Sequence, residues 1–329
     1  MKILVTGASS MIGRHTVAGL LARGDVVTTL QRHETGLATG DRQVCEVLGS
    51  ITDRDCVARA CEGQEAIVHL AAKVGVLGSW AEYERTNVGG TVLLIDEARR
   101  CGVKAFVHVS SPAVAHAGNA LVGAAAEPAD PEATRGHYAT SKAIAESFAL
   151  RATSVAMPVV AIRPHLVWGP GDTQLVGRII ERARQGRLML VGSGTALIDT
   201  TYVANAASAL IAAVDRARLL GGRAFVVSNG EPRTVDELVS RMVSAAGVEW
   251  SHKRVPKNLA IGGGTIIERI WSAAGRADDP PMTRFLAEQL STAHWFDQRE
   301  TRIALNWVPH VSLAEGFTIL AAWFRSNPM

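Results

Sequence analysis

The chain has 329 residues, of which 47% are hydrophobic and 20% are charged, and its formal net charge is +3. This length and composition predict one large or two ordinary folded domains and exclude an intrinsically disordered chain. Because the basic residues are spread along the sequence rather than clustered, we expect a small-molecule partner and no nucleic acid.

The N-terminus and the cysteines indicate where the protein works. A short apolar run precedes Thr6, too short for a signal peptide, and no stretch reaches the roughly 18 apolar residues of a membrane span. The four cysteines lack metal-site spacing. We therefore expect a cytoplasmic protein with no metal site and no transmembrane span. Residues 259–271, LAIGGGTIIERIW, are apolar enough for a lid or for peripheral membrane contact.

Short apolar runs alternate with amphipathic stretches through the first half of the chain. The expected strands are 2–7, 25–31, 65–72, 105–111 and 159–164, and the expected helices are 13–24, 56–63 and 91–102. Near-continuous apolarity is typical of strands covered on both faces, and the intervening helices fit right-handed crossovers. We predict an α/β fold with a Rossmann-type doubly wound parallel sheet.

After about residue 170 the strands become fewer and loops interrupt the helices. Thr234 stands three residues before Glu237, the spacing of a capping box, and this predicts a helix that starts there. We predict a dinucleotide-binding Rossmann domain over residues 1–170. A smaller C-terminal substrate-binding region over residues 171–329 is expected to interleave with it.

The stretch GASSMIGRH, residues 7–15, follows the first expected strand, which is where a dinucleotide site lies. Gly7 permits a tight turn and Gly13 permits close packing of helix on sheet, with free amides that would face a pyrophosphate. Ser10 replaces a middle glycine, and its hydroxyl could bond a phosphate. Many strand-to-helix turns carry glycine merely to turn, but the βα units that follow favour nucleotide binding.

The end of the second expected strand indicates which nucleotide binds. An acid there would bind the ribose 2′-hydroxyl, whereas a base would accept a 2′-phosphate. Gln31 and Arg32 stand at this position without an acid. Because arginine pairs with a phosphate through two N–H groups, we predict NADP(H) as the preferred cofactor, with NAD(H) as the alternative. The competing interpretation makes Arg32 an ordinary solvated loop residue.

Tyr138 and Lys142 are four residues apart, which places both on one face of a helix. A nearby ammonium favours the phenolate, so the pair could exchange a proton near neutral pH. Ser110 and Ser111 follow an expected strand at the sheet edge where α/β proteins bind ligands. Taken alone, the tyrosine–lysine spacing is common on helix surfaces, and the serines also fit a turn before Pro112.

Together these motifs resemble the extended short-chain dehydrogenases/reductases. The likeness runs over essentially the whole chain, in the family's order, and rests on 5–13 (VTGASSMIG), 69–72 (HLAA), 86–91 (TNVGGT), 107–114 (VHVSSPAV) and 162–172 (IRPHLVWGPGD), with Tyr138 and Lys142.

The resemblance implies a role for each matching residue. Tyr138 would be the general acid, or the base in the reverse direction, and Lys142 would lower the tyrosine's pKa and hold the nicotinamide ribose. Ser111 would hydrogen-bond the substrate oxygen, and Asn87 would position the active-site strand or a water. The expected cofactor-binding residues are Gly7, Ser9, Ser10, Met11, Ile12, Gly13, Arg32, Ser50, Ile51, Leu70, Ala71, Ala72, Tyr138, Lys142, Pro164 and Leu166.

The sequence departs from the family pattern at two positions. Ser10 replaces the second glycine of the turn. Ser50 stands where many members carry an acid directed at the adenine, so that contact would pass to Ile51 and Asp53.

Segments of the C-terminal half refine the resemblance. They are 163–172, 190–209, 280–297 and 305–317, and they look like the 3β-hydroxysteroid dehydrogenase-like branch, most of all the 2-alkyl-3-oxoalkanoate reductases. This implies NADP(H)-dependent reduction of a hydrophobic 2-alkyl-3-oxo acid to the 3-hydroxy acid. The alternatives are an NAD(P)-dependent 3β-hydroxysteroid dehydrogenase, a sugar-nucleotide epimerase and a non-catalytic NADP-sensing protein.

Three residues are expected to contact the substrate, namely Ala113, His165 and Arg284. Arg284 or His165 would bind a carboxylate. Residues 259–271 and 285–290 would form an apolar tunnel wall, although the first of these fits an ordinary packed helix equally well. Relatives often pair through the helix that bears the tyrosine, and we expect a homodimer.

Overall fold

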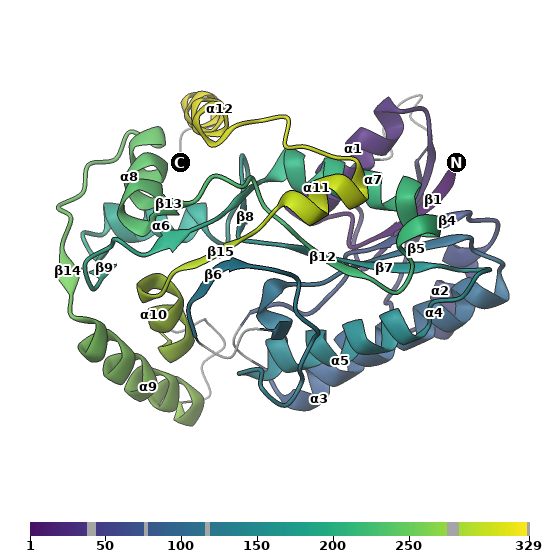
Figure 1. Cartoon of the computed structure of the whole chain (residues 1–329), viewed down its shortest axis with the longest axis horizontal. Helices are drawn as coiled ribbons and strands as arrows, with labels where there is room; N and C mark the ends of the chain where they lie inside the picture. Colours follow the sequence, from purple (N-terminus) through teal and green to yellow (C-terminus); the bar gives the residue numbers. More distant parts are fainter. Residues whose placement is uncertain (38–43, 76–77, 116–118, 275–282, 328–329) are drawn as a thin grey trace.

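The computed structural model describes residues 1–37, 44–75, 78–115, 119–274 and 283–327 (Figure 1). Its main sheet has seven parallel strands, which lie side by side in the order β12 (Ala224–Val227), β7 (Val159–Pro164), β5 (Ala105–Val109), β4 (Ala66–His69), β1 (Lys2–Thr6), β2 (Val26–Gln31) and β3 (Val44–Leu48). The chain winds outward from β1 in both directions, so the predicted Rossmann-type doubly wound sheet is confirmed.

Helices cover both faces of this sheet (Figure 1). One face carries α1 (Met11–Ala22), α7 (Val203–Leu220) and α11 (Arg299–Leu305), and the other carries α2 (Arg54–Cys61), α4 (Gly90–Arg100) and α5 (His137–Arg151). A single turn, α3 (Trp80–Tyr83), and a π-helical segment, η1 (Glu84–Gly89), lead into α4. Both faces of the strands are therefore buried, which explains their continuous apolarity.

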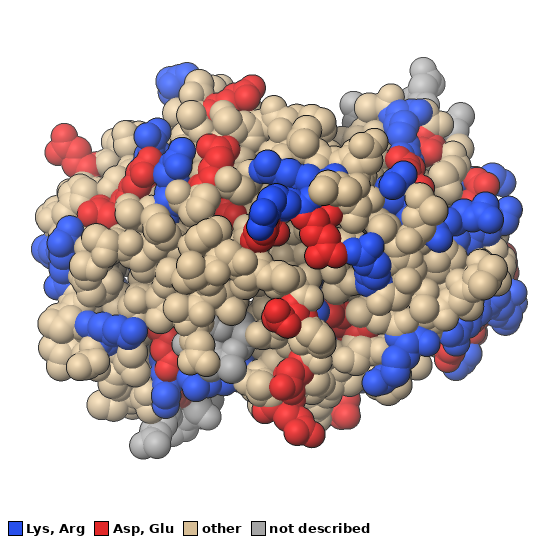
Figure 2. Space-filling view, viewed as in Figure 1, with Lys and Arg blue, Asp and Glu red and all other residues tan. Residues whose placement is uncertain are grey.

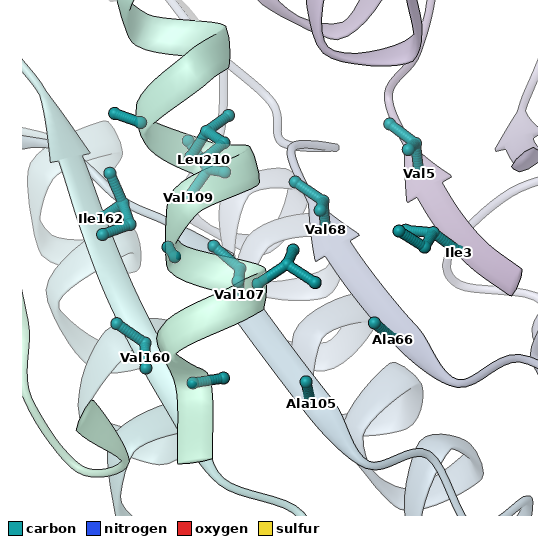
Figure 3. Close-up of a cluster of buried hydrophobic side chains, with 14 of the residues drawn as sticks. Ile3, Val5, Ala66, Val68, Ala105, Val107, Val109, Val160, Ile162 and Leu210 are labelled. Atoms are coloured by element: carbon teal, nitrogen blue, oxygen red, sulfur yellow. The ribbon is translucent and has the colours of Figure 1, made fainter. Parts of the chain in front are cut away.

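Small and β-branched side chains fill the layer between the sheet and α7. Figure 3 labels Ile3, Val5, Ala66, Val68, Ala105, Val107, Val109, Val160, Ile162 and Leu210, all of which are buried. Complete burial of a valine or isoleucine side chain stabilises the fold by about 1.5–3 kcal/mol. This layer fixes the central strands, and their carboxyl ends carry the site.

The remaining elements form a second layer beyond the carboxyl ends of the main strands (Figure 1). Its strands are β6 (Leu121–Ala124), β8 (Val167–Trp168), β9 (Leu190–Val191), β10 (Leu197–Ile198), β11 (Thr201–Tyr202), β13 (Arg233–Thr234), β14 (Arg254–Val255) and β15 (His294–Phe296). Its helices are η2 (Pro112–Ala115), α6 (Val176–Arg184), α8 (Val235–Ala245), α9 (Lys257–Ala273), α10 (Arg284–Ser291) and α12 (Leu313–Ser326). A four-stranded sheet in the order β13-β10-β15-β6 lies at its centre.

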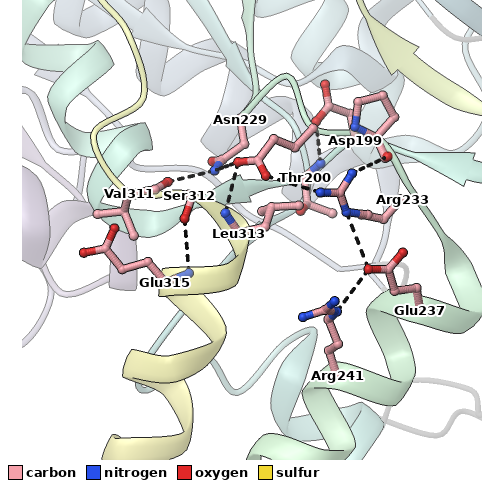
Figure 4. Close-up of polar contacts among 12 residues, drawn as sticks. Asp199, Thr200, Asn229, Arg233, Glu237, Arg241, Val311, Ser312, Leu313 and Glu315 are labelled. Carbon is pink, nitrogen blue, oxygen red and sulfur yellow. Dashed lines mark hydrogen bonds and ion pairs between the residues drawn. The ribbon is translucent and has the colours of Figure 1, made fainter.

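Helix α8 begins where the sequence predicts. The Thr234 hydroxyl accepts a hydrogen bond from the Glu237 amide at 3.2 Å. The Glu237 carboxylate does not complete a capping box but pairs with Arg233 at 3.5 Å and Arg241 at 3.0 Å (Figure 4). These pairs lie at the surface along the first two turns of α8.

The two regions share elements. Strand β12 and helix α7 come after residue 170 yet complete the main sheet and its core, whereas β6 precedes residue 170 and lies in the second sheet. A boundary at residue 170 therefore separates sequence segments rather than layers of structure.

Charges of both signs occur at the surface (Figure 2). Acidic and basic side chains are interspersed over the face shown in Figure 2. None of the helices within the described ranges is long and apolar enough to span a membrane.

Candidate active site

The turn between β1 and α1 requires its glycines. Gly7 has a φ of +72°, and a Cβ added there would lie 2.8 Å from the Ala71 amide nitrogen. A Cβ on Gly13 would lie 2.4 Å from the Gly7 carbonyl oxygen, so this helix start approaches the turn as closely as the sequence predicts. The two glycines therefore let the turn, the start of α1 and the segment after β4 pack backbone against backbone.

Ser10 has a structural task in this turn. Its hydroxyl donates to the Gly7 carbonyl at 2.8 Å and accepts from the Gly13 amide at 3.1 Å, which caps α1. The hydroxyl is therefore committed to the turn rather than to the phosphate contact expected of it. The amides of Met11 and Ile12, in the first turn of α1, have no earlier helical turn to bond and are the natural phosphate donors.

The end of β2 differs from the sequence-based expectation, because an acid does lie there. Glu46 pairs opposite Thr29 in the sheet, and its carboxylate accepts from the Gln31 side-chain amide at 3.1 Å and from the Thr35 amide at 3.2 Å. The Arg32 side chain is exposed and bonds no residue within the described ranges. At the end of β2 the Arg32 guanidinium is thus unbonded within the described ranges, whereas the Glu46 carboxylate is bonded.

The adenine side of the expected site consists of Ser50 and Ile51. Ser50 is partly buried, and Ile51 is buried against Gly90, where an added Cβ would lie 2.7 Å from the Ile51 Cδ1 atom. Asp53 also has a structural role, because its carboxylate caps α2 and accepts from the Cys56 amide at 3.1 Å. This hydrogen bond holds the pKa of Asp53 below its usual value.

The segment after β4 lies beside the glycine turn. The Leu70 amide donates to the Thr6 carbonyl and the Ala71 amide to the Thr6 hydroxyl, both at 3.2 Å. This places Leu70, Ala71 and Ala72 between β1 and β4, the point where the chain reverses direction across the sheet and where α/β proteins bind ligands.

The structure brings Ser111 and Tyr138 together, with Lys142 one turn further along α5. The Ser111 hydroxyl lies close enough to the Tyr138 phenol to lower its pKa, yet burial raises this pKa by more. The Lys142 ammonium is 3% exposed and donates to the Val109 carbonyl at 2.6 Å, and burial lowers its pKa to about 8. The pKa of Tyr138 therefore shifts opposite to the expected direction, because desolvation outweighs the effect of Ser111.

Asn87 ties the end of β4 to α5. Its side-chain oxygen accepts from the Lys73 amide at 2.6 Å, and its amide nitrogen donates to the Lys73 carbonyl at 3.0 Å and to the Ser141 hydroxyl at 2.9 Å. Ser141 in turn donates to the Tyr138 carbonyl at 2.9 Å. Asn87 thus positions the helix turn that carries Tyr138.

A buried hydrogen-bonded chain reaches Asn87 from the glycine turn. Thr6 bonds Nδ1 of His69 at 2.7 Å, Nε2 of His69 bonds Thr91 at 2.9 Å, and Thr91 donates to the Asn87 carbonyl at 2.6 Å. Because Thr91 donates onward, His69 must carry its proton on Nε2. Burial, with the charge of Lys142, lowers the pKa of His69 to about 3, so the ring stays neutral. The sequence motifs contain His69 and Thr91, but their role was not expected from the sequence.

One cavity of about 400 Å³ opens onto the reacting group. Its lining includes Ser111, Tyr138, Ala113, Pro164, His165, Leu166 and Arg284, so all three expected substrate residues face it. The second sheet supplies the opposite wall, with Leu121 from β6 and His294 and Phe296 from β15. The cavity therefore lies between the two layers, at the carboxyl ends of β5 and β7.

His165 and Arg284 are each bonded to another residue of the cavity wall. His165 Nε2 lies 3.1 Å from Nδ1 of His294, whose Nε2 donates to the Gln289 carbonyl at 2.9 Å. The Arg284 Nε donates to Glu288 at 2.9 Å, and the arginine side chain is 53% exposed. Neither His294 nor Glu288 was expected from the sequence.

Among its described residues, α9 does not form the expected apolar wall. Glu268 is the residue of α9 that lines the cavity, whereas Leu259, Ile266 and Ile270 of the same helix are exposed. Residues 280–282 and the side chains of Phe285 and Leu286 lie outside the described parts of the chain. On the described residues, this side of the cavity is charged.

Comparisons with known proteins show what this chain is similar to. The model of a family described as the NAD dependent epimerase/dehydratase family matches residues 3–228. A 2-alkyl-3-oxoalkanoate reductase of Stenotrophomonas maltophilia is 40% identical over 328 residues, which are 98% of this chain and 99% of the relative. A 3 beta-hydroxysteroid dehydrogenase/Delta 5→4-isomerase of Mycobacterium tuberculosis is 31% identical over 266 residues, 77% of this chain and 72% of the relative. Among solved structures, MoeE5 in complex with UDP-glucose and NAD matches with a TM-score of 0.74 at 24% identity, over 100% of both chains.

Proposed function

The chain belongs to the NAD dependent epimerase/dehydratase family, and we propose that it is an NADP(H)-dependent reductase of a hydrophobic 2-alkyl-3-oxo acid. The observation that carries the proposal is the joint position of Ser111 and Tyr138 on one cavity, with Lys142 buried behind them. The end-to-end likeness to a 2-alkyl-3-oxoalkanoate reductase supports the substrate class. The coarser assignment, an NAD(P)-dependent oxidoreductase of the extended short-chain type, follows from the family.

The residues act on the ketone oxygen. Ser111 holds this oxygen by a hydrogen bond, and Tyr138 gives it a proton while the nicotinamide, when bound, supplies the hydride to the carbonyl carbon. A raised pKa keeps Tyr138 protonated at neutral pH, which suits an acid in the reducing direction. Lys142 places a positive charge behind the phenol, which favours the phenolate that forms as the proton leaves.

The cofactor preference rests on Arg32. Its free guanidinium at the end of β2 suits a 2′-phosphate. Glu46 stands close by, but its carboxylate already accepts from Gln31 and Thr35. We therefore propose NADP(H), with NAD(H) as the alternative that Glu46 would favour.

A hydroxysteroid dehydrogenase is the second candidate, because the same serine, tyrosine and lysine serve that reaction and a relative of that name is 31% identical. The cavity wall separates the two candidates. Arg135 and Arg284 both line it, and guanidinium groups suit an acid better than a neutral steroid.

The test is the loss of NADPH absorbance with a 2-alkyl-3-oxo acid and with a 3-ketosteroid, repeated with NADH. We expect turnover of the acid with NADPH, and a loss of at least about 100-fold in kcat for Tyr138→Phe, since the proton donor is gone. Tyr202→Phe, in the second core, is the matched control and should keep its activity. Turnover of the steroid alone would establish the second candidate instead.

A further inference from the structure

Two arginines from different parts of the fold meet one carboxylate at the cavity. The Arg135 Nη1 atom lies 2.9 Å from Glu288 Oε2, and the Arg284 Nε atom lies 2.9 Å from Glu288 Oε1. Glu288 is 13% exposed, whereas the arginines are 49% and 53% exposed. All three residues line the cavity that contains Tyr138.

The guanidinium groups of this cluster keep hydrogen-bonding capacity for a ligand. Glu288 pairs with both of them, and with Glu268, whose charge also acts on Arg284, the wall holds two positive and two negative groups. The other acid of the wall, Glu268, accepts a hydrogen bond from the Arg284 backbone amide at 3.0 Å, and Arg284 is the first residue of α10. Glu268 thus satisfies a helix N-terminus, and the two bonds to Glu288 leave further N–H groups on each guanidinium.

Arg135 is also close to the reacting group along the chain. It precedes Gly136, which caps α5 with a φ of +85°, and it stands three residues before Tyr138. In a 3-oxo acid a single carbon separates the carboxylate carbon from the ketone carbon. A group that binds this carboxylate must therefore lie near the tyrosine that protonates the ketone oxygen.

We propose that Arg135, together with Arg284, binds the carboxylate of the substrate, and that this site selects ionised 3-oxo acids over neutral ketones. The inference rests on the proposed function and names the group that sets its substrate class. Guanidinium groups bind a carboxylate through paired, charge-assisted hydrogen bonds. Glu288 occupies the two guanidinium groups before the substrate arrives and competes with the substrate carboxylate for them. The expected anchor changes from Arg284 or His165 to the pair of arginines.

The test compares a 2-alkyl-3-oxo acid with its methyl ester at saturating NADPH. We expect the wild type to prefer the acid, and Arg135→Gln to lower kcat/KM for the acid by about 10- to 100-fold while the ester changes less than about threefold. Arg151→Gln is the matched control, because Arg151 lies at the far end of α5 and stacks on Phe148. In that control, kcat/KM should stay unchanged for both the acid and the ester.

A second variant tests the same site in the opposite direction. Glu288→Gln removes the carboxylate that competes for the guanidinium groups, so KM for the acid should fall while KM for the ester stays constant. This variant decides the matter even if Arg135→Gln does not fold.

The outcomes separate the two proposals. Equal losses for acid and ester in Arg135→Gln would mean a structural role and overturn the inference, as would a wild type that reduces acid and ester equally well. Both of these results would leave the reductase function standing. A wild type that reduces neither compound would overturn the proposed function, and the inference with it.

Discussion

Burial sets the chemistry of Lys142. Its ammonium has one backbone carbonyl as a partner and lies behind the cavity wall, and the charge of Glu146 only partly offsets the desolvation. Desolvation of an ammonium disfavours its charged form, which is why its pKa falls from 10.5 to about 8. The charge that aids Tyr138 therefore reduces the stability of the folded protein.

This conflict predicts a gain of stability when the charge is removed. Between pH 8 and 10.5 the folded protein binds fewer protons at Lys142 than the unfolded chain, so stability from this group rises with pH across that window and is lowest below it. Lys142→Met should abolish turnover yet raise the free energy of unfolding of the cofactor-free protein at pH 7 by about 2 kcal/mol. Denaturant unfolding at a series of pH values measures both effects.

The difference in the free energy of unfolding between Lys142→Met and the wild type should disappear as the pH approaches 10.5. Lys104→Met, at an exposed position, serves as the control and should leave stability unchanged at every pH. A Lys142→Met protein that is less stable than the wild type at pH 7 would contradict this account of the burial.

At this scale, sequence predicted the residues whose partners are local and missed those whose partners are not. Gly13 approaches Gly7 within one turn, and its requirement follows from the geometry of that turn. Glu46 reaches the end of β2 only because β3 pairs with β2 in a register that no spacing reveals. Glu288 and His294 reach the cavity through the packing of α10 and β15, far along the chain from the motifs that the sequence displays.

Helix α5 is the element on which the site depends. Lys142 ties it to the end of β5, and Ser141 ties it to Asn87. One turn further on, Glu146 forms a buried ion pair with Arg163 of β7, with an Nε–Oε2 distance of 2.9 Å. These contacts fix the rotation of α5, and with it the direction in which Tyr138 points.

The hydrogen-bonded chain from β1 through β4 to α5 predicts the effect of a substitution distant from the cavity. Thr91→Val keeps the shape of the side chain but removes the acceptor for His69 and the donor to the Asn87 carbonyl. We expect a loss of about 1–3 kcal/mol in the free energy of unfolding, because two buried polar groups lose their partner. The decrease in kcat should exceed any change in KM, since Asn87 orients α5.

Thr16→Val is the matched control for this substitution. Thr16 is equally buried and also donates to the carbonyl four residues earlier, but within α1 and with no further link. Thr16→Val should lower the free energy of unfolding by less than about 1 kcal/mol and leave kcat unchanged. Equal effects of the two substitutions on kcat would show that the chain does not position Tyr138.

Elements with strong periodicity could be predicted, and weak edge elements could not. The expected strands over 2–7 and 105–111 contain β1 and β5, because both run through the centre of the sheet and are apolar on both faces. Strand β3 was missed, since an edge strand with Glu46 at its middle lacks that pattern. The short strands of the second sheet gave no signal, because pairing partners from β6, β10 and β15 define them rather than their own composition.

On the scale of the whole molecule, α7 joins the two layers. Its first residue, Val203, packs in the core of the second layer, and Leu210 and Val214 pack against the main sheet. The core of the main sheet thus needs residues from both sides of position 170. The same is true of the cavity, whose walls come from β5, β7 and α5 on one side and from α10 and β15 on the other.

This sharing predicts that residues 1–170 do not fold alone. Without β12 and α7, strand β7 becomes an exposed edge, and Val107, Val109 and Ile162 lose the helix that covers them. Each uncovered side chain costs about 1.5–3 kcal/mol, and a few such losses equal the total stability of an ordinary domain.

The isolated fragment should therefore show no cooperative thermal transition by circular dichroism, whereas the full chain should unfold in a single transition. Adding residues 171–329 as a separate polypeptide should restore the transition, because it supplies the missing strand and helix. A fragment that melts cooperatively on its own would mean that the first core is complete without α7, and that the cavity forms by docking of two preformed units.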